Sequence, residues 1–327
     1  MVARRSSGHR NLSRASYKTK SLKFRIGKIP VNIHASFFLM TVFLSGSWNE
    51  PALIAVWAAV VLVSVLVHEM GHALMGQAFG LEPSIDLHGM GGTTSWPKPS
   101  GRKISTTRSV LISVAGPGLG MIVGAGIIAY VFVNGRPEPL LARQAVDDAI
   151  WVNIGWGFMN LLPILPLDGG NVLRSLLHAS ESTRREKIAR LVSIATAVLA
   201  TAAAVLLLHS WWAALLGGMF TFQNFRALRE VQTLEQDDAL RADLDAAYKA
   251  LEREDGVAVL AHAEPVLARA KSAPYRAEAI HLAAYGYLLT GRVADADRVL
   301  AQLPAGYKAH PSLTELRARY EAKGTAG

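Results

Sequence analysis

Apolar residues are grouped along the first two thirds of the chain into five long blocks, separated by shorter polar stretches. A helix needs about 20 apolar residues to cross a hydrocarbon core about 30 Å thick, and each of the first four blocks suits one such helix. The fifth block would reach about 50 Å as a single helix, so its interruption at His209, Ser210, Trp211 and Trp212 predicts a helical hairpin. The blocks lie at about 30–46, 51–80, 109–133, 146–167 and 190–225.

This pattern predicts an all-α polytopic membrane protein with about six transmembrane helices. Between the second and third blocks, residues 84–96 alternate in polarity around a group of glycines, which predicts a small re-entrant β-hairpin. Irregular backbone of this kind is stable at membrane depth only where protein or a wet cavity covers it. We therefore expect the hairpin to pack against the transmembrane helices.

The last hundred residues have a different character, because Ala, Leu, Glu and Arg dominate there with helical periodicity. Residues 279–300 resemble a tetratricopeptide unit, and residues 243–270 are compatible with a degenerate preceding repeat. A short helical bundle explains the same composition equally well. We therefore predict three parts: a basic arm at 1–29, a transmembrane domain at 30–226, and a soluble C-terminal α-helical hairpin domain, tetratricopeptide-like, at 227–327. Small or apolar residues occupy the repeat positions Ala284, Tyr287, Gly291, Ala296 and Leu300.

Composition narrows the chemistry that the chain can perform. Hydrophobic residues make up 51% of the chain and charged residues 18%, against about 25% charged in a typical soluble protein. The chain has no cysteine, which excludes disulfides, thiolate metal sites and cysteine nucleophiles. A metal would therefore be bound by His, Asp or Glu, a set that suits zinc or another borderline ion.

The net charge of +9 is distributed unevenly, and its distribution predicts a topology. A basic arm before an apolar segment is typical of a cytoplasmic anchor on anionic lipid; nucleic-acid binding is the alternative that we do not favour. Positive loops favour the cytoplasm, so we expect a multi-pass protein of the cell membrane with both termini cytoplasmic. The arm carries Arg4, Arg5, Arg10, Arg14, Lys18, Lys20, Lys23, Arg25 and Lys28, and the inner loops carry Lys98, Arg102, Lys103, Arg108, Arg174, Arg184, Arg185, Lys187 and Arg190.

The second apolar block contains ionisable residues in the order His68, Glu69, His72. Ionisable side chains within a membrane span are costly and usually functional. Residues four apart lie on one face of a helix, so both imidazoles can reach one ion with Glu69 beside them. A hydrogen-bonded pair of buried histidines is the structural alternative, and a metal-transport site is the functional one.

A catalytic zinc takes three protein ligands and keeps one open position, so a third ligand is required. Asp168 ends the fourth apolar block and precedes two glycines. Pro163 and Pro166 should break the helix just before it and free backbone groups at membrane depth. Taken alone, this segment is more simply interpreted as an ordinary helix end with an Asp-Gly turn.

Together, the His-Glu segment and the segment that ends at Asp168 resemble the motifs of the site-2 protease family of intramembrane zinc metalloproteases. His68, Glu69 and His72 match the first family motif, and Asn160, Pro163, Pro166, Asp168 and Gly169 match the second. The resemblance extends over about residues 28–225 and includes Ala115-Gly116-Pro117. One departure is Leu165, where many relatives carry another proline.

The resemblance implies that His68, His72 and Asp168 hold one Zn²⁺ ion and that Glu69 moves protons during peptide hydrolysis. Asn160 is expected either to steady the oxyanion or to stabilise the helix break. The implied substrates are transmembrane segments of other proteins, and the C-terminal domain is expected to bind a protein partner. Substrate identity and oligomeric state do not follow from the sequence. His34 and His88 are interpreted as polar interface residues, and a catalytically silent relative remains a rival interpretation.

Overall fold

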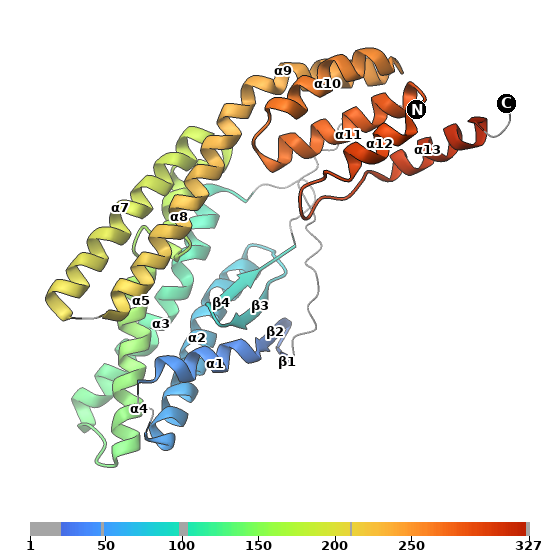
Figure 1. Cartoon of the computed structure of the whole chain (residues 1–327). Helices are drawn as coiled ribbons and strands as arrows, with labels where there is room; N and C mark the ends of the chain where they lie inside the picture. The colour runs from blue at the N-terminus through green and yellow to red at the C-terminus, as the bar shows by residue number, and fades with distance from the viewer. Residues whose placement is uncertain (1–20, 47–48, 98–103, 210, 325–327) are drawn as a thin grey trace. The chain divides into compact units, whose positions relative to one another are not determined.

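The computed structural model describes residues 21–46, 49–97, 104–209 and 211–324. These residues are mostly helical and divide into two compact units, one ending at Ala227 and the other beginning at Leu228 (Figure 1). Most of the predicted basic arm lies outside the described residues, as do Lys98, Arg102 and Lys103.

Helices form most of the first unit. Among the described residues, three helices are long and apolar enough to cross a membrane by length and composition: α2, α3 and α7. The remaining spans of the predicted six stay a prediction. The helical segments are α1 (Ala35–Leu44), α2 (Pro51–Ala78), α3 (Thr106–Asn134), α4 (Leu140–Ile150), a π-helical turn (Trp151–Gly155), α5 (Trp156–Asn160), α6 (Asp168–Leu176), a 3-10 turn (Ala179–Glu181), α7 (Thr183–Leu208) and α8 (Trp211–Asp237).

A four-stranded sheet lies against this helical unit, so the β-structure is larger than the single hairpin that was predicted beside the helices. The predicted hairpin is confirmed as β3 (Ser84–His88) and β4 (Gly91–Ser95). It does not stand alone, because β1 (Ser21–Ile26) and β2 (Ile29–His34) extend the sheet in the order β1-β2-β3-β4. Only β2 and β3 are parallel, in a register that pairs Val31 with Ile85.

The strand β2 corrects the prediction of one helix over 30–46. Ile29, Val31 and Ile33 are buried and alternate with half-exposed residues, which is the period of a strand that covers a core on one face. Helix α1 begins only at Ala35. The apolar content of this block was correctly recognised, but its period of two was missed.

The apolar face of the sheet packs on α2. Val31, Ile85 and Leu87 are completely buried and share a core with Val61 and Ala73 of α2. Burial of one such aliphatic side chain contributes about 1.5–3 kcal/mol. The core therefore fixes the sheet onto the helix that carries the His-Glu motif.

The breaks predicted in the later apolar blocks are confirmed. Helix α5 ends at Asn160, and α6 starts at Asp168 after the two prolines. Helix α7 ends and α8 begins on either side of residues 209–210. The two helices run side by side (Figure 1), and a Cβ atom added to Gly217 of α8 would overlap Thr201 of α7. Small residues thus permit close approach of these helices, as in many membrane helix pairs.

The second unit is built from helical pairs around one apolar core. Gly291 lies between α11 and α12 at φ 77°, a conformation that glycine adopts without strain. Completely buried residues such as Val259, Ala263, Ile280 and Ala283 interlock α10 with α11. The helices are α9 (Arg241–Glu252), α10 (Gly256–Arg269), α11 (Ala273–Leu289), α12 (Val293–Leu300) and α13 (Pro311–Gly324).

Candidate metal centre

Three side chains from two distant segments converge at one point. His68 and His72 project from the same face of α2, with their Nε2 atoms 3.2 Å apart. Asp168, the first residue of α6, places Oδ2 3.1 Å from His68 Nε2 and Oδ1 3.3 Å from His72 Nε2. A hundred residues separate His68 from Asp168 in the sequence, so tertiary packing alone creates the cluster.

Helix α3 fixes the orientation of His72. The Nδ1–H group of His72 donates to the carbonyl of Ile112 at 2.7 Å, which leaves Nε2 as the atom with a lone pair. A Cβ atom added to Gly116 would overlap the His72 ring, and one added to Gly71 would overlap the backbone at Ala115. The glycines therefore allow α2 and α3 to approach closely enough for this hydrogen bond.

The hairpin holds Glu69 on the other side of the cluster. Thr94 of β4 donates from Oγ1 to Glu69 Oε2 at 2.7 Å, and the same hydroxyl lies 3.1 Å from the Glu69 carbonyl oxygen. Glu69 is only 5% exposed, and a Cβ atom at Gly92 would overlap its carboxylate. The carboxylate thus lies beneath the sheet, and a ligand-type atom from each of His68, Glu69 and His72 falls within 4.8 Å of the others.

The donor atoms fit a divalent cation. Tetrahedral ligands at about 2.0–2.1 Å from zinc lie about 3.3 Å from one another, close to the spacing of the His68, His72 and Asp168 atoms. Without a cation, the Nε2 lone pair of neutral His72 would face the Asp168 carboxylate across 3.3 Å. Two imidazoles and one carboxylate also form one of the known ligand sets of catalytic zinc.

The other residues proposed from the sequence lie elsewhere. Asn160 ends α5, is half-buried, and makes no side-chain hydrogen bond within the described part of the chain. His34 lies 3.7 Å from Asp86, and His88 bonds to Thr93 at 3.0 Å. Strand alternation puts these groups on the sheet face opposite Gly92 and Thr94, away from the cluster.

Sequence reasoning missed Thr94 and the Ile112 carbonyl, which orient Glu69 and His72. The Ile112 carbonyl has no sequence signal, because any residue offers a backbone oxygen. Thr94 had a weak signal, since alternation places it on the same hairpin face as Gly92. Only the contact between sheet and α2 shows that this face meets Glu69.

The chain is similar to known proteins over much of its first unit. Residues 140–202, which include Asp168, match the model of Peptidase family M50. "Zinc metalloprotease MJ0392" of Methanocaldococcus jannaschii is 30% identical over 160 residues, which are 47% of this chain and 44% of that protein. "Putative zinc metalloprotease sll0528" of Synechocystis sp. is 28% identical over 238 residues, which are 66% of this chain and 61% of that protein. The chain thus spans less than two thirds of the length of either relative.

A solved structure, "Site-2 Protease from Methanocaldococcus jannaschii", superposes with a TM-score of 0.46 at 25% sequence identity, and covers 64% of this chain and 95% of its own. None of these comparisons supports the tetratricopeptide resemblance of residues 279–300. Part of the chain is thus similar to peptidase family M50, and up to 66% of it is similar to two zinc metalloproteases.

Proposed function

We propose that this protein is an intramembrane zinc endopeptidase of the site-2 type. His68, His72 and Asp168 are the proposed zinc ligands, and Glu69 is the proposed general base. The observation that carries the proposal is the convergence of the three donor groups to 3.1–3.3 Å, beside a buried carboxylate that is held in place by Thr94.

The proposed reaction is hydrolysis of a peptide bond by one water molecule. Zinc bound by this ligand set would supply a Lewis acid that polarises the scissile carbonyl and acidifies water. Glu69 accepts a proton from the water as its oxygen bonds to the carbonyl carbon. The same carboxyl then returns the proton to the amide nitrogen as the C–N bond breaks. Thr94 keeps the Glu69 carboxylate oriented through both transfers. Asn160 is proposed either to stabilise the oxyanion or to stabilise the helix break, as expected from the sequence.

The proposed substrates are membrane-spanning segments of other proteins. A regular helix hides its carbonyls in hydrogen bonds, so the scissile region must unwind before it is cut. Strand β4 ends the sheet, so its outer edge lacks a strand neighbour among the described residues, and Glu69 lies directly beneath it. We propose that this edge pairs with the unwound segment. Efficient cleavage by a variant that lacks residues 84–96 would contradict the pairing.

We further propose six spans with both termini in the cytoplasm. Helices α2, α3 and α7 would be three of them, and the helical segments over 140–160 and 211–225 two more. The sixth, expected from residues 30–46, stays a prediction, because α1 has only ten residues, about 15 Å of the about 30 Å needed. Lys and Arg concentrate in the loops that this topology places inside, which supports the orientation. The soluble C-terminal unit would then meet its protein partner in the cytoplasm.

The test is a comparison of wild type with Glu69→Gln in lipid vesicles that contain a tagged single-span reporter protein. The amide keeps the size of Glu69 but cannot accept the proton, so zinc content should stay at one ion per chain while cleavage is lost. Glu82→Gln is the matched control, because Glu82 is exposed in the loop after α2. Full cleavage by Glu69→Gln would refute the proposed base, and a zinc content near zero in wild type would refute the metal site.

A further inference from the structure

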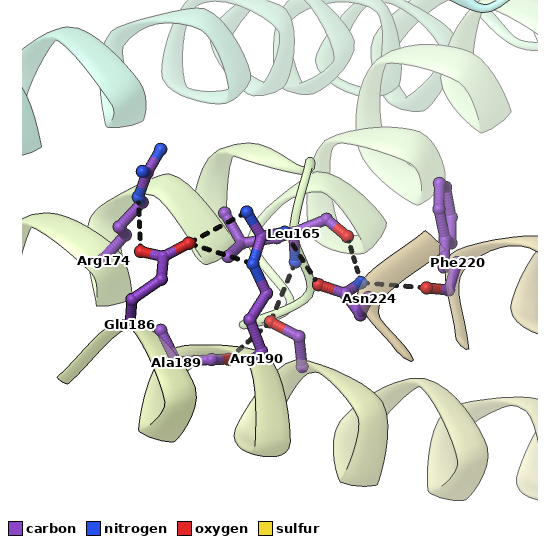
Figure 2. A network of polar contacts seen from close by, with 8 residues as sticks. Leu165, Arg174, Glu186, Ala189, Arg190, Phe220 and Asn224 are labelled. Atoms are coloured by element: carbon purple, nitrogen blue, oxygen red, sulfur yellow. Dashed lines mark hydrogen bonds and ion pairs between the residues drawn. The ribbon is translucent and has the colours of Figure 1, made fainter. Parts of the chain in front are cut away.

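Both backbone polar groups of Leu165, its N–H and its carbonyl, bond to side chains of the α7–α8 hairpin (Figure 2). Its N–H donates to Ser193 Oγ of α7 at 3.1 Å, and its carbonyl accepts from Asn224 Nδ2 of α8 at 2.6 Å. Both side chains are completely buried, and Leu165 is 3% exposed. Leu165 precedes the proposed ligand Asp168 by three residues.

These two side chains are themselves fully engaged. Asn224 also donates to the Phe220 carbonyl at 2.9 Å and accepts from Arg190 Nη1 at 3.1 Å. Ser193 donates to the Ala189 carbonyl at 2.8 Å. Every polar atom of Asn224 therefore has a partner, which fixes the direction of the N–H group that it offers to Leu165.

The same network reaches the helix that follows Asp168. Arg190 bonds to Glu186 Oε1 at 3.0 Å, and Glu186 Oε2 accepts from Arg174 Nε at 2.9 Å (Figure 2). Arg174 belongs to α6, whose first residue is Asp168. The chain is therefore bonded to the α7–α8 hairpin on both sides of Asp168: at Leu165 before it and at Arg174 after it.

The segment between these attachments is too tightly packed to move independently. A Cβ atom added to Gly170 would lie 2.5 Å from the Leu165 nitrogen, and one added to Gly169 would overlap the Leu161 carbonyl. The Leu167 N–H donates to the Ile164 carbonyl at 2.7 Å. A displacement of the Leu165 peptide would therefore be transmitted to Asp168.

We propose that Ser193 and Asn224 are positioning residues that keep Asp168 in register with His68 and His72. This proposal rests on the metal site proposed above. It also gives Leu165 a role, because a proline at that position would have no N–H to donate to Ser193. The hairpin of α7 and α8 is then part of the catalytic apparatus although it contributes no residue to the ligand set.

A purely structural role for the network would stabilise the helix pair without affecting the metal. The experiment therefore uses the full chain in detergent and compares Ser193→Ala and Asn224→Leu with Thr41→Val. Thr41 is a matched control, because it is 4% exposed and donates to the carbonyl four residues earlier at 2.8 Å, as Ser193 does, but it lies in α1. Hydrogen exchange of the metal-free protein, zinc affinity and the visible spectrum of the Co²⁺ form are measured.

Loss of the Ser193 or the Asn224 side chain should accelerate amide exchange over residues 161–170. It should also weaken zinc binding by about 10- to 100-fold, the usual cost of losing a group that orients a ligand. The Co²⁺ spectrum should change in both variants and stay unchanged in Thr41→Val. Wild-type exchange, zinc affinity and Co²⁺ spectrum in a folded Ser193→Ala protein would overturn the proposal, even if Asn224→Leu fails to fold. If wild type bound no zinc, the proposed function would fail, while the exchange measurement would still decide whether Ser193 and Asn224 hold the segment.

Discussion

Replacing Thr94 by valine removes one hydroxyl from the site and preserves the shape of the side chain. The Thr94 hydroxyl donates to the Glu69 carboxylate at 2.7 Å, and its single proton cannot serve the Glu69 carbonyl at the same time. A hydrogen bond to a charged group contributes about 1.5–3 kcal/mol. Because about 1.4 kcal/mol corresponds to a tenfold change in rate, kcat should fall by about 10- to 150-fold if Thr94 orients the base in the transition state.

The assay is initial-rate cleavage of the single-span reporter in vesicles, at several reporter densities, so that kcat and KM separate. KM should change little, because Thr94 touches Glu69 and the proposed substrate edge is the backbone of β4. Thr93→Val is the matched control: Thr93 is adjacent on the same strand, is exposed on the opposite face, and bonds to His88. A kcat for Thr94→Val within about twofold of wild type would refute the role assigned to the hydroxyl.

Two further predictions concern packing and pH. Gly116→Ala should abolish zinc binding, because the new methyl group would overlap the His72 ring. The control Gly118→Ala should keep zinc, because a Cβ atom there meets nothing within 4 Å. Normal zinc binding by Gly116→Ala would contradict the packing argument. In the second unit, burial opposes ionisation of Asp237. Its carboxylate, however, accepts hydrogen bonds from the backbone N–H of Ser272 at 2.6 Å and of Lys271 at 3.1 Å, which hold the pKa of Asp237 below its ordinary value. The stability from this carboxylate is therefore present above about pH 4 and is lost as pH falls through the folded-state pKa. Asp237→Asn should accelerate amide exchange at the start of α11 at neutral pH. Equal exchange in both proteins would disprove the role assigned to the Asp237 carboxylate.

The local part of the metal site could be predicted, since two histidines four residues apart on a helix must share a face. The break before Asp168 was also predictable, because proline removes a backbone donor and disrupts the helix. Convergence of Asp168 on the histidines was a hypothesis that rested on the family motif. Spacing along one chain does not encode contact between α2 and α6.

The sheet was only half predictable for a related reason. The turn at Gly89–Met90 joins β3 to β4 locally, so alternation and glycine sufficed to find that hairpin. Pairing of β2 with β3 joins residues 54 positions apart, such as Val31 and Ile85, and no local sequence pattern predicts it. The apolar content of residues 30–46 therefore suggested a span, whereas burial of alternate residues beneath β3 selects a strand for the first part.

The central claim is tested most directly by X-ray absorption at the zinc edge on the full chain in detergent, with one equivalent of zinc. The account predicts two imidazole nitrogens and a carboxylate oxygen at about 2.0–2.2 Å in wild type, with the oxygen contribution reduced in Asp168→Ala and the imidazole contribution halved in His72→Ala. An identical spectrum for wild type and both variants would contradict the account, because the bound zinc would then have other ligands.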